Sequence, residues 1–210
     1  MKLRVLAAAA VALLLAGCGS IHPGAAAVVG DTSISMSRAD DTASVYCRLA
    51  LLSAPGGSPV SNADVRRQAV TDLVVGVVAR EMAEDADLNL NPSTYEITPA
   101  QRKEIAAAIP GAELGPVVDA IGSSQRTFAI AEALGAEEVD DPDAEPQQLR
   151  EEGLQLIQAE VARRDVRFDP RFGIGDDGAQ KASSGSLSVP VKEASAPDKE
   201  GLPATQQCAS

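Results

Sequence analysis

The residues of this chain best suited to covalent chemistry are its three cysteines, Cys18, Cys47 and Cys208. Cys18 ends an N-terminal pattern that begins with Lys2 and Arg4 and continues as an unbroken apolar run over residues 5–15. A secretory signal peptide typically has a positively charged N-terminal region, an apolar region of about 7–15 residues and a cleavage site of small residues. A transmembrane helix needs about 20 apolar residues, so this run is too short to span a bilayer. We therefore predict a signal peptide over residues 1–17.

The residues at the predicted cleavage point, Leu15-Ala16-Gly17-Cys18, resemble the lipobox of bacterial lipoproteins. In that family the cysteine thiol receives a diacylglyceryl group before cleavage. The resemblance implies cleavage between Gly17 and Cys18, a palmitate-type lipid on Cys18, and a place on the extracytoplasmic face of the cell membrane. Membrane lipid would then be the first partner of the protein, and residues 18–25 would form the lipidated cysteine and a short tether. Ordinary cleavage followed by secretion is the alternative.

Lipidation of Cys18 would leave Cys47 and Cys208 as the remaining thiols. An even number of cysteines in an oxidising compartment favours a disulfide, and this one would tie the C-terminal tail to the first helix. Two separate thiols are the alternative. A zinc site is disfavoured, because His22 is the only histidine and the two cysteines lie far apart in the sequence.

The chain is strongly acidic, with 30 Asp and Glu against 18 Lys and Arg. Loss of Lys2 and Arg4 with the signal peptide would change the net charge from −12 to −14. Nucleic-acid binding requires a basic patch for the phosphates, so we predict no nucleic-acid partner. Solubility is the simplest role for the acidity. The high content of Ala, Val, Asp and Arg suggests a GC-rich, actinobacterial source.

Two further patterns lack parts that their chemistry needs. Residues 173–178 fit GxGxxG, but no helix pattern follows and Asp176 and Asp177 would repel a pyrophosphate, so we interpret them as a turn. The acidic loop 137–146 lacks the glycine and the late glutamate of a calcium-binding EF-hand, and we interpret it as a solvated loop. With no nucleophile motif either, we predict no enzyme, no metal and no cofactor.

The elements that would position these residues are mainly helical. Residues 26–29 and 32–35 predict a short β-hairpin, and Val166 to Phe168 predict a short C-terminal strand. Between them, helix patterns with their caps and breaks lie at residues 38–52, 62–87, 99–109, 113–136 and 147–165. Ser37, Ser61 and Thr98 are the predicted N-caps, and breaks at Gly115-Pro116 and Gly122 could divide the fourth helix.

The helix at 62–87 is the strongest pattern and is predicted to be central. Apolar residues fall at helical spacing from Val65 to Met82, and Val74 and Val75 widen the apolar face beyond one side. We therefore predict a multi-helix body over residues 26–173, followed by a low-complexity tail over residues 174–210 that is mostly extended or disordered.

The order of these elements resembles the N-terminal chaperone domain of SurA-like and PrsA-like exported proteins. The resemblance is carried by AAVVGDTSIS at 26–35, RQAVTDLVV at 67–75, ITPAQR at 97–102 and VRFDPRFG at 166–173. It implies a mainly α fold with a short N-terminal hairpin, and helices that form an apolar cradle for non-native or newly exported polypeptides. The expected activity is that of a holdase, which keeps such chains from aggregating.

The chain departs from this family in one respect. SurA-like and PrsA-like proteins usually add a parvulin-type prolyl isomerase domain with paired histidines, whereas this chain has only His22, in the tether. Prolyl isomerase activity is therefore not expected. A scaffold lipoprotein that binds one defined partner and has no chaperone activity is the main alternative.

Overall fold

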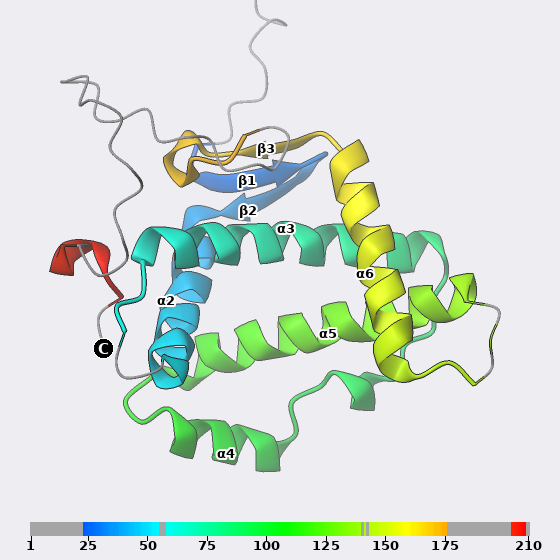
Figure 1. Cartoon of the computed structure of the whole chain (residues 1–210), viewed down its shortest axis with the longest axis horizontal. Helices are drawn as coiled ribbons and strands as arrows, with labels where there is room; N and C mark the ends of the chain where they lie inside the picture. Colours follow the sequence, from blue (N-terminus) through cyan, green and yellow to red (C-terminus); the bar gives the residue numbers. More distant parts are fainter. Residues whose placement is uncertain (1–22, 55–57, 140, 142, 176–202, 209–210) are drawn as a thin grey trace, which may run out of the picture.

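A computed structural model describes residues 23–54, 58–139, 141, 143–175 and 203–208, and within these residues the fold is mainly helical (Figure 1). The elements are, in chain order, β1 (Ala25–Val29), β2 (Thr32–Ser35), α2 (Met36–Ser53), α3 (Asn62–Asp85), η2 (Pro92–Thr94), α4 (Pro99–Ala108), α5 (Leu114–Glu138), α6 (Pro146–Arg163), β3 (Val166–Phe168), η3 (Pro170–Phe172) and η5 (Ala204–Gln206). The predicted fold class is therefore confirmed. The signal peptide, the lipobox cysteine and His22 lie outside the described residues.

The sheet is a small antiparallel one with β1 between its two partners, in the order β2–β1–β3. Gly30 turns the hairpin at φ 54°, a left-handed conformation that glycine adopts without steric cost, and Val29 then pairs with Thr32. On the other side of β1, Val29 pairs with Val166 of β3. The predicted hairpin and the predicted C-terminal strand are therefore both present, and their pairing in one sheet is a feature that the sequence patterns did not predict.

Helix α3 is central, as predicted. It packs against α2, α5, α6 and the strand β1, and Val70, Val74 and Val78 are completely buried along it. Its N-cap is Ser61, whose side chain accepts a hydrogen bond from the backbone N–H of Asp64 at 3.3 Å. In Figure 1, α3 runs beneath the sheet, with α5 on its other side and α2 and α6 crossing near its ends.

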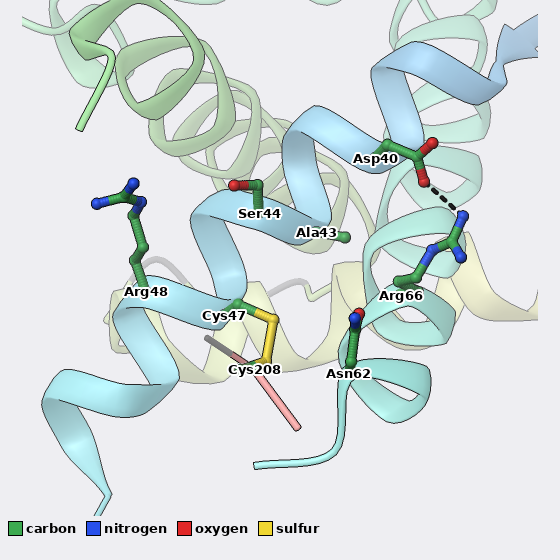
Figure 2. Close-up of a pocket in the computed structure, with 8 residues that line it drawn as sticks. All are labelled: Asp40, Ala43, Ser44, Cys47, Arg48, Asn62, Arg66 and Cys208. Atoms are coloured by element: carbon green, nitrogen blue, oxygen red, sulfur yellow. Dashed lines mark hydrogen bonds and ion pairs between the residues drawn. A yellow bond between two sulfur atoms is a disulfide. The ribbon is translucent and has the colours of Figure 1, made fainter. Parts of the chain in front are cut away.

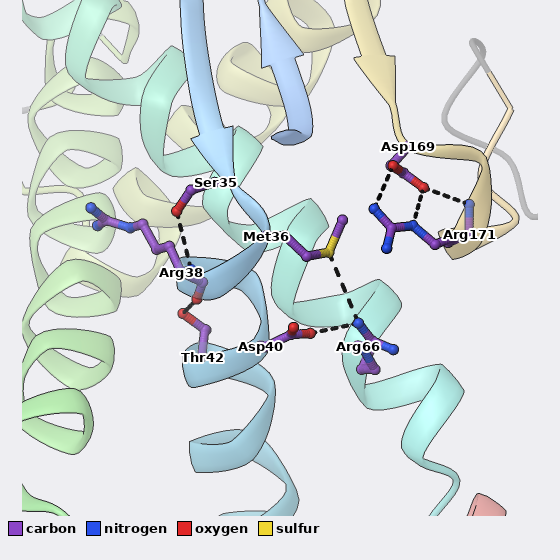
Figure 3. Close-up of polar contacts among 8 residues, drawn as sticks. All are labelled: Ser35, Met36, Arg38, Asp40, Thr42, Arg66, Asp169 and Arg171. Carbon is purple, nitrogen blue, oxygen red and sulfur yellow. Dashed lines mark hydrogen bonds and ion pairs between the residues drawn. The ribbon is translucent and has the colours of Figure 1, made fainter. Parts of the chain in front are cut away.

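The structure differs from the sequence analysis at one helix start and at one possible break within a helix. The N-cap of α2 is Ser35 and not Ser37, because β2 leads directly into the helix and the Ser35 hydroxyl accepts from the Arg38 N–H at 3.2 Å (Figure 3). Helix α5 continues without a break through Pro116 and Gly122. Pro116 lies in the first helical turn, where its missing N–H has no helical partner to lose.

Helices α5 and α6 share the most extensive helix–helix interface, and two glycines make it possible. A Cβ atom on Gly135 would lie 1.8 Å from the carbonyl oxygen of Leu149, and one on Gly153 would lie 1.8 Å from that of Ala131. No side chain fits at either position, so the two backbones are in direct contact.

The end of the chain folds back onto the body. Gln207 forms a β-bridge with Ser61, and the Cys208 N–H donates to the Val60 carbonyl at 2.8 Å. Ile174, which the sequence analysis placed in the tail, is buried in the main core. Ile174 therefore belongs to the helical body, one residue beyond the predicted boundary, and residues 203–208 are held against it as the predicted disulfide implied.

Candidate functional site

An open groove of about 1380 Å³ lies between α3 and α5. Residues of α2 line one part of it and residues of α6 another, and the link around Tyr95 together with Arg102 of α4 adds to its wall. Figure 1 shows how these helices are arranged, with α2 and α6 toward opposite ends of α3 and α5. Residues of five helices and of the link around Tyr95 therefore build this one surface.

Apolar side chains from three helices contribute to the groove. Leu73 and Val75 come from α3, Val118 from α5, and Leu154 and Val161 from α6. Val75, Leu154 and Val161 are only partly buried and pack against the main core, so they present apolar surface that the fold itself does not cover. Contiguous apolar surface of this kind is typical of interaction sites.

Phe128 of α5 adds an exposed aromatic ring to the groove. It is 40% exposed and is, with Leu52, one of two large apolar side chains that are strongly exposed among the described residues. The Arg150 guanidinium lies over its ring at 5.4 Å from the centroid. Leu52 does not line the groove, which makes it a natural control position for Phe128.

Four arginines line the groove, and besides Arg102 of α4 these are Arg38 from α2, Arg80 from α3 and Arg126 from α5. Within the described residues none of them forms an ion pair. Burial lowers the pKa of Arg80, and the positive charges of Arg38 and Arg126 lower it further. Arg38 and Arg126 therefore each lie close enough to Arg80 to repel its guanidinium group.

Gly76 brings Arg80 and α5 together. A Cβ atom at Gly76 would lie 3.4 Å from Thr127 Oγ1, 3.6 Å from Arg80 Nη1 and 3.9 Å from Ser123 Oγ. The Arg80 guanidinium thus folds back over its own helix, beside the hydroxyls of α5. Across the groove the Arg126 guanidinium lies 5.4 Å from the centroid of the Tyr95 ring, a cation–π contact that orients it.

Tyr46 and Asp72 form a second polar feature of the groove wall. Burial raises the pKa of Tyr46, and the neighbouring Asp72 carboxylate raises it further. Desolvation also raises the pKa of Asp72, although the Tyr46 hydroxyl opposes that change. The Tyr46 hydroxyl and the Asp72 carboxylate therefore interact directly within the groove wall.

A smaller cavity of about 420 Å³ lies beside the predicted disulfide (Figure 2). Cys47 and Cys208 are joined, with their Cα atoms 5.4 Å apart, so this prediction is confirmed. Asp40 and Arg66 close one side with an ion pair of 2.5 Å. Arg66 also lies over the Phe172 ring at 5.6 Å. Because the disulfide and the Asp40–Arg66 ion pair both line it, we regard this cavity as part of the structural joint between α2, α3 and the C-terminal segment.

The remaining predicted positions contribute little to a site. Gly17 and Cys18 lie outside the described residues, as do Asp140 and residues 176–178 of the GxGxxG pattern. Gly173 ends η3 at φ 62°, which agrees with the turn predicted there. Among the described residues no cluster of histidine, cysteine or acidic side chains could hold a metal ion. No helix in this part of the chain is long and apolar enough to cross a membrane.

The comparisons with known proteins found no match: no protein-family model, no curated protein and no solved structure corresponds to this chain. The resemblance to SurA-like proteins therefore stays a proposal that depends on the elements described above.

Sequence analysis did not identify the groove or its arginines. The apolar residues of α3 predict a buried helix. Their pattern does not predict which of them remain partly exposed in the folded protein. Arg126 carries a weak signal, because it has no acidic residue three or four positions away on its helix, where an intrahelical ion pair would form. Its proximity to Arg38 and Arg80 depends on how α2, α3 and α5 pack.

Proposed function

We propose that this protein is an exported lipoprotein that holds non-native or newly exported polypeptides in the groove between α3 and α5. The observation that carries the proposal is the groove itself, which combines apolar side chains of three helices with an exposed Phe128. Its volume of about 1380 Å³ exceeds the roughly 300–1,000 Å³ typical of small-molecule sites, which favours a polypeptide segment as the occupant.

The N-terminus supports the same proposal. The signal pattern and the lipobox resemblance would place the groove outside the cytoplasm, on a tether attached to the membrane through Cys18. Newly exported chains emerge there with their apolar residues exposed. An open groove with several small apolar contacts suits weak binding of many sequences, since specificity would need tighter complementarity.

Suppression of aggregation tests this function. The protein, purified in its processed form, should reduce light scattering by a chemically unfolded client when present in several-fold molar excess. Phe128→Ser removes the exposed ring of the groove and should weaken the effect several-fold, whereas Leu52→Ser removes an equally apolar side chain outside the groove and should not. An absence of suppression by the unmodified protein would contradict the proposal.

Two further measurements separate the alternatives. Cross-linking in cells should capture many exported polypeptides, and capture of one defined partner would favour the scaffold function instead. A prolyl isomerisation assay on a model peptide should remain at the uncatalysed rate, and clear acceleration would favour the isomerase function.

A further inference from the structure

We propose that Arg38, Arg80 and Arg126 form a binding site for the carboxylate of an aspartate or glutamate within the polypeptide that occupies the groove. This inference rests on the proposed function and names the chemical class of segment that the groove selects, an acidic residue flanked by apolar ones.

The three side chains reach the groove from separate helices, so their proximity is a feature of the tertiary fold. Figure 3 shows Arg38 extending from α2 on the side opposite to the Asp40–Arg66 ion pair. Arg80 folds over Gly76 toward Thr127, and Arg126 is held by the Tyr95 ring. Guanidinium groups provide several N–H donors in a planar arrangement that suits carboxylates.

Among the described residues, most other arginines pair with an acid of the protein, and Arg48 and Arg102 do not. Arg66 binds Asp40 at 2.5 Å, Arg164 binds Glu81 at 2.6 Å, and Arg171 binds Asp169 at 2.9 Å. The three arginines of the proposed site have no such partner among the described residues, although the chain carries 30 acids. The repulsion of Arg80 by the other two would be relieved by an anion placed between them.

The acids that line the groove do not serve as the anion that would relieve this repulsion. Four acids contribute to its lining, namely Asp41, Asp72, Glu96 and Asp119. The negative charges that act on Arg80 are instead those of Glu81 and Glu84, which belong to its own helix and do not line the groove. The positive charges that act on it, from Arg38 and Arg126, are both groove residues.

The surroundings of the arginines favour a polypeptide carboxylate. Leu73 and Val118 lie in the same groove, so a ligand must bring apolar groups beside its charge. The Ser123 hydroxyl on the same side of α5 adds a hydrogen-bond donor for the same anion, whereas the Thr127 hydroxyl already donates to the Ser123 carbonyl at 3.0 Å. The net charge of −12 disfavours a long polyanion as the ligand.

Two fluorescently labelled peptides test the proposal. Both have the same apolar sequence of about twelve residues, with a central pair of aspartates in one and of asparagines in the other. Fluorescence anisotropy with the purified, processed protein should show about tenfold tighter binding of the aspartate peptide, because two or three charge-assisted hydrogen bonds form only with that peptide. The difference should shrink as salt is raised.

Matched variants locate the effect. Arg80→Gln with Arg126→Gln should bring the affinity for the aspartate peptide down to that for the asparagine peptide. Arg48→Gln should leave the preference unchanged, because Arg48 lies on α2 beside the smaller cavity and also has no ion pair among the described residues. Arg38→Gln, at an exposed position, provides a second variant should the double one not fold, and it should reduce the preference at least threefold.

Each contrary outcome is distinct. Equal affinity for the two peptides would overturn the carboxylate site and leave the proposed function standing. Failure of both peptides to bind would overturn the proposed function and this inference with it. Displacement of bound peptide by a long-chain fatty acid, with the fatty acid bound more tightly than either peptide, would overturn the inference in favour of a lipid ligand.

Discussion

At the residue scale, Asp169 shows how one carboxylate fixes the end of the sheet. Its backbone N–H donates to Ala26 of β1 at 2.9 Å, and its side chain accepts from the Arg171 N–H at 2.9 Å, which begins η3. The Arg171 guanidinium binds the same carboxylate through two nitrogens, at 2.9 and 3.0 Å (Figure 3). These bonds place Phe172 in the main core.

The charge of Asp169 should make stability depend on pH. Hydrogen bonds from Arg171 hold the pKa of Asp169 below its usual value, so its ionised form stabilises the folded state. That contribution is complete above an unfolded pKa of about 3.9 and is lost as the pH falls through the lower folded pKa. Asp169→Asn keeps a capping oxygen but loses the charge, and should be less stable than wild type at pH 7.

Chemical unfolding at pH 7 and pH 2 measures this difference. The difference in the free energy of unfolding between wild type and Asp169→Asn should be smaller at pH 2 than at pH 7, because Asp169 loses its charge as the pH falls through its lowered pKa. Asp169→Ala, which also loses the cap, should cost about 1 kcal/mol at pH 7. If the difference in the free energy of unfolding between wild type and Asp169→Asn is the same at the two pH values, the charge of Asp169 contributes nothing to stability.

At the element scale, the packing of α5 on α6 depends on the absence of side chains at Gly135 and Gly153. The sequence placed Gly153 on the inner edge of its helix, and the structure buries it there. What the sequence could not show is the partner, because the close approach is to the backbone of Ala131 on another helix.

A methyl group at Gly153 should therefore be strongly destabilising. Gly153→Ala would force the backbones of α5 and α6 apart and should lower the free energy of unfolding by about 3 kcal/mol. Gly115→Ala is the matched control, because no atom lies within 4 Å of a Cβ there, and it should change stability by less than about 1 kcal/mol. Equal effects of the two substitutions in urea unfolding would contradict the close crossing.

The helix caps and turns that could be predicted from the sequence are those that depend only on neighbouring residues. Thr98 caps α4 in a full capping box with Gln101, and Gly30 turns the hairpin, because these structures need only neighbouring residues. The α2 cap was misplaced, since the choice between Ser35 and Ser37 depends on where β2 pairs with β1. The arginine site was missed for a related reason, because it exists only when three helices are packed.

At the scale of the whole molecule, the C-terminal segment closes the fold. Cys208 packs with Ala43, Val65 and Ala69 in a cluster of its own beside Cys47, and the disulfide fastens it to α2. The sequence predicted this pair from the number of cysteines and the expected compartment. The hydrogen bond to Val60 and the bridge to Ser61 could not be predicted, because they depend on a long return of the chain.

The disulfide should contribute measurably to stability. Its cysteines are 161 positions apart. Closing so long a loop reduces the entropy of the unfolded chain, and in the entropic model this stabilises the folded state by about 4–5 kcal/mol. Measured disulfides more usually contribute about 2–4 kcal/mol. Cys47→Ser with Cys208→Ser should lower the free energy of unfolding by the latter amount. A reductant should lower the free energy of unfolding of wild type by the same amount and should leave the stability of the double variant unchanged. Two alkylatable thiols at these positions in the native, unreduced protein would contradict the pairing.

The central claim is that the groove between α3 and α5 holds polypeptide, and site-specific photo-cross-linking tests it most directly. A photoreactive amino acid would replace Phe128 in the groove or, as the control, Leu52 at the end of α2. With a labelled unfolded client, the account predicts strong cross-linking from position 128 and little from position 52. Equal cross-linking from both positions, or none from position 128, would contradict it.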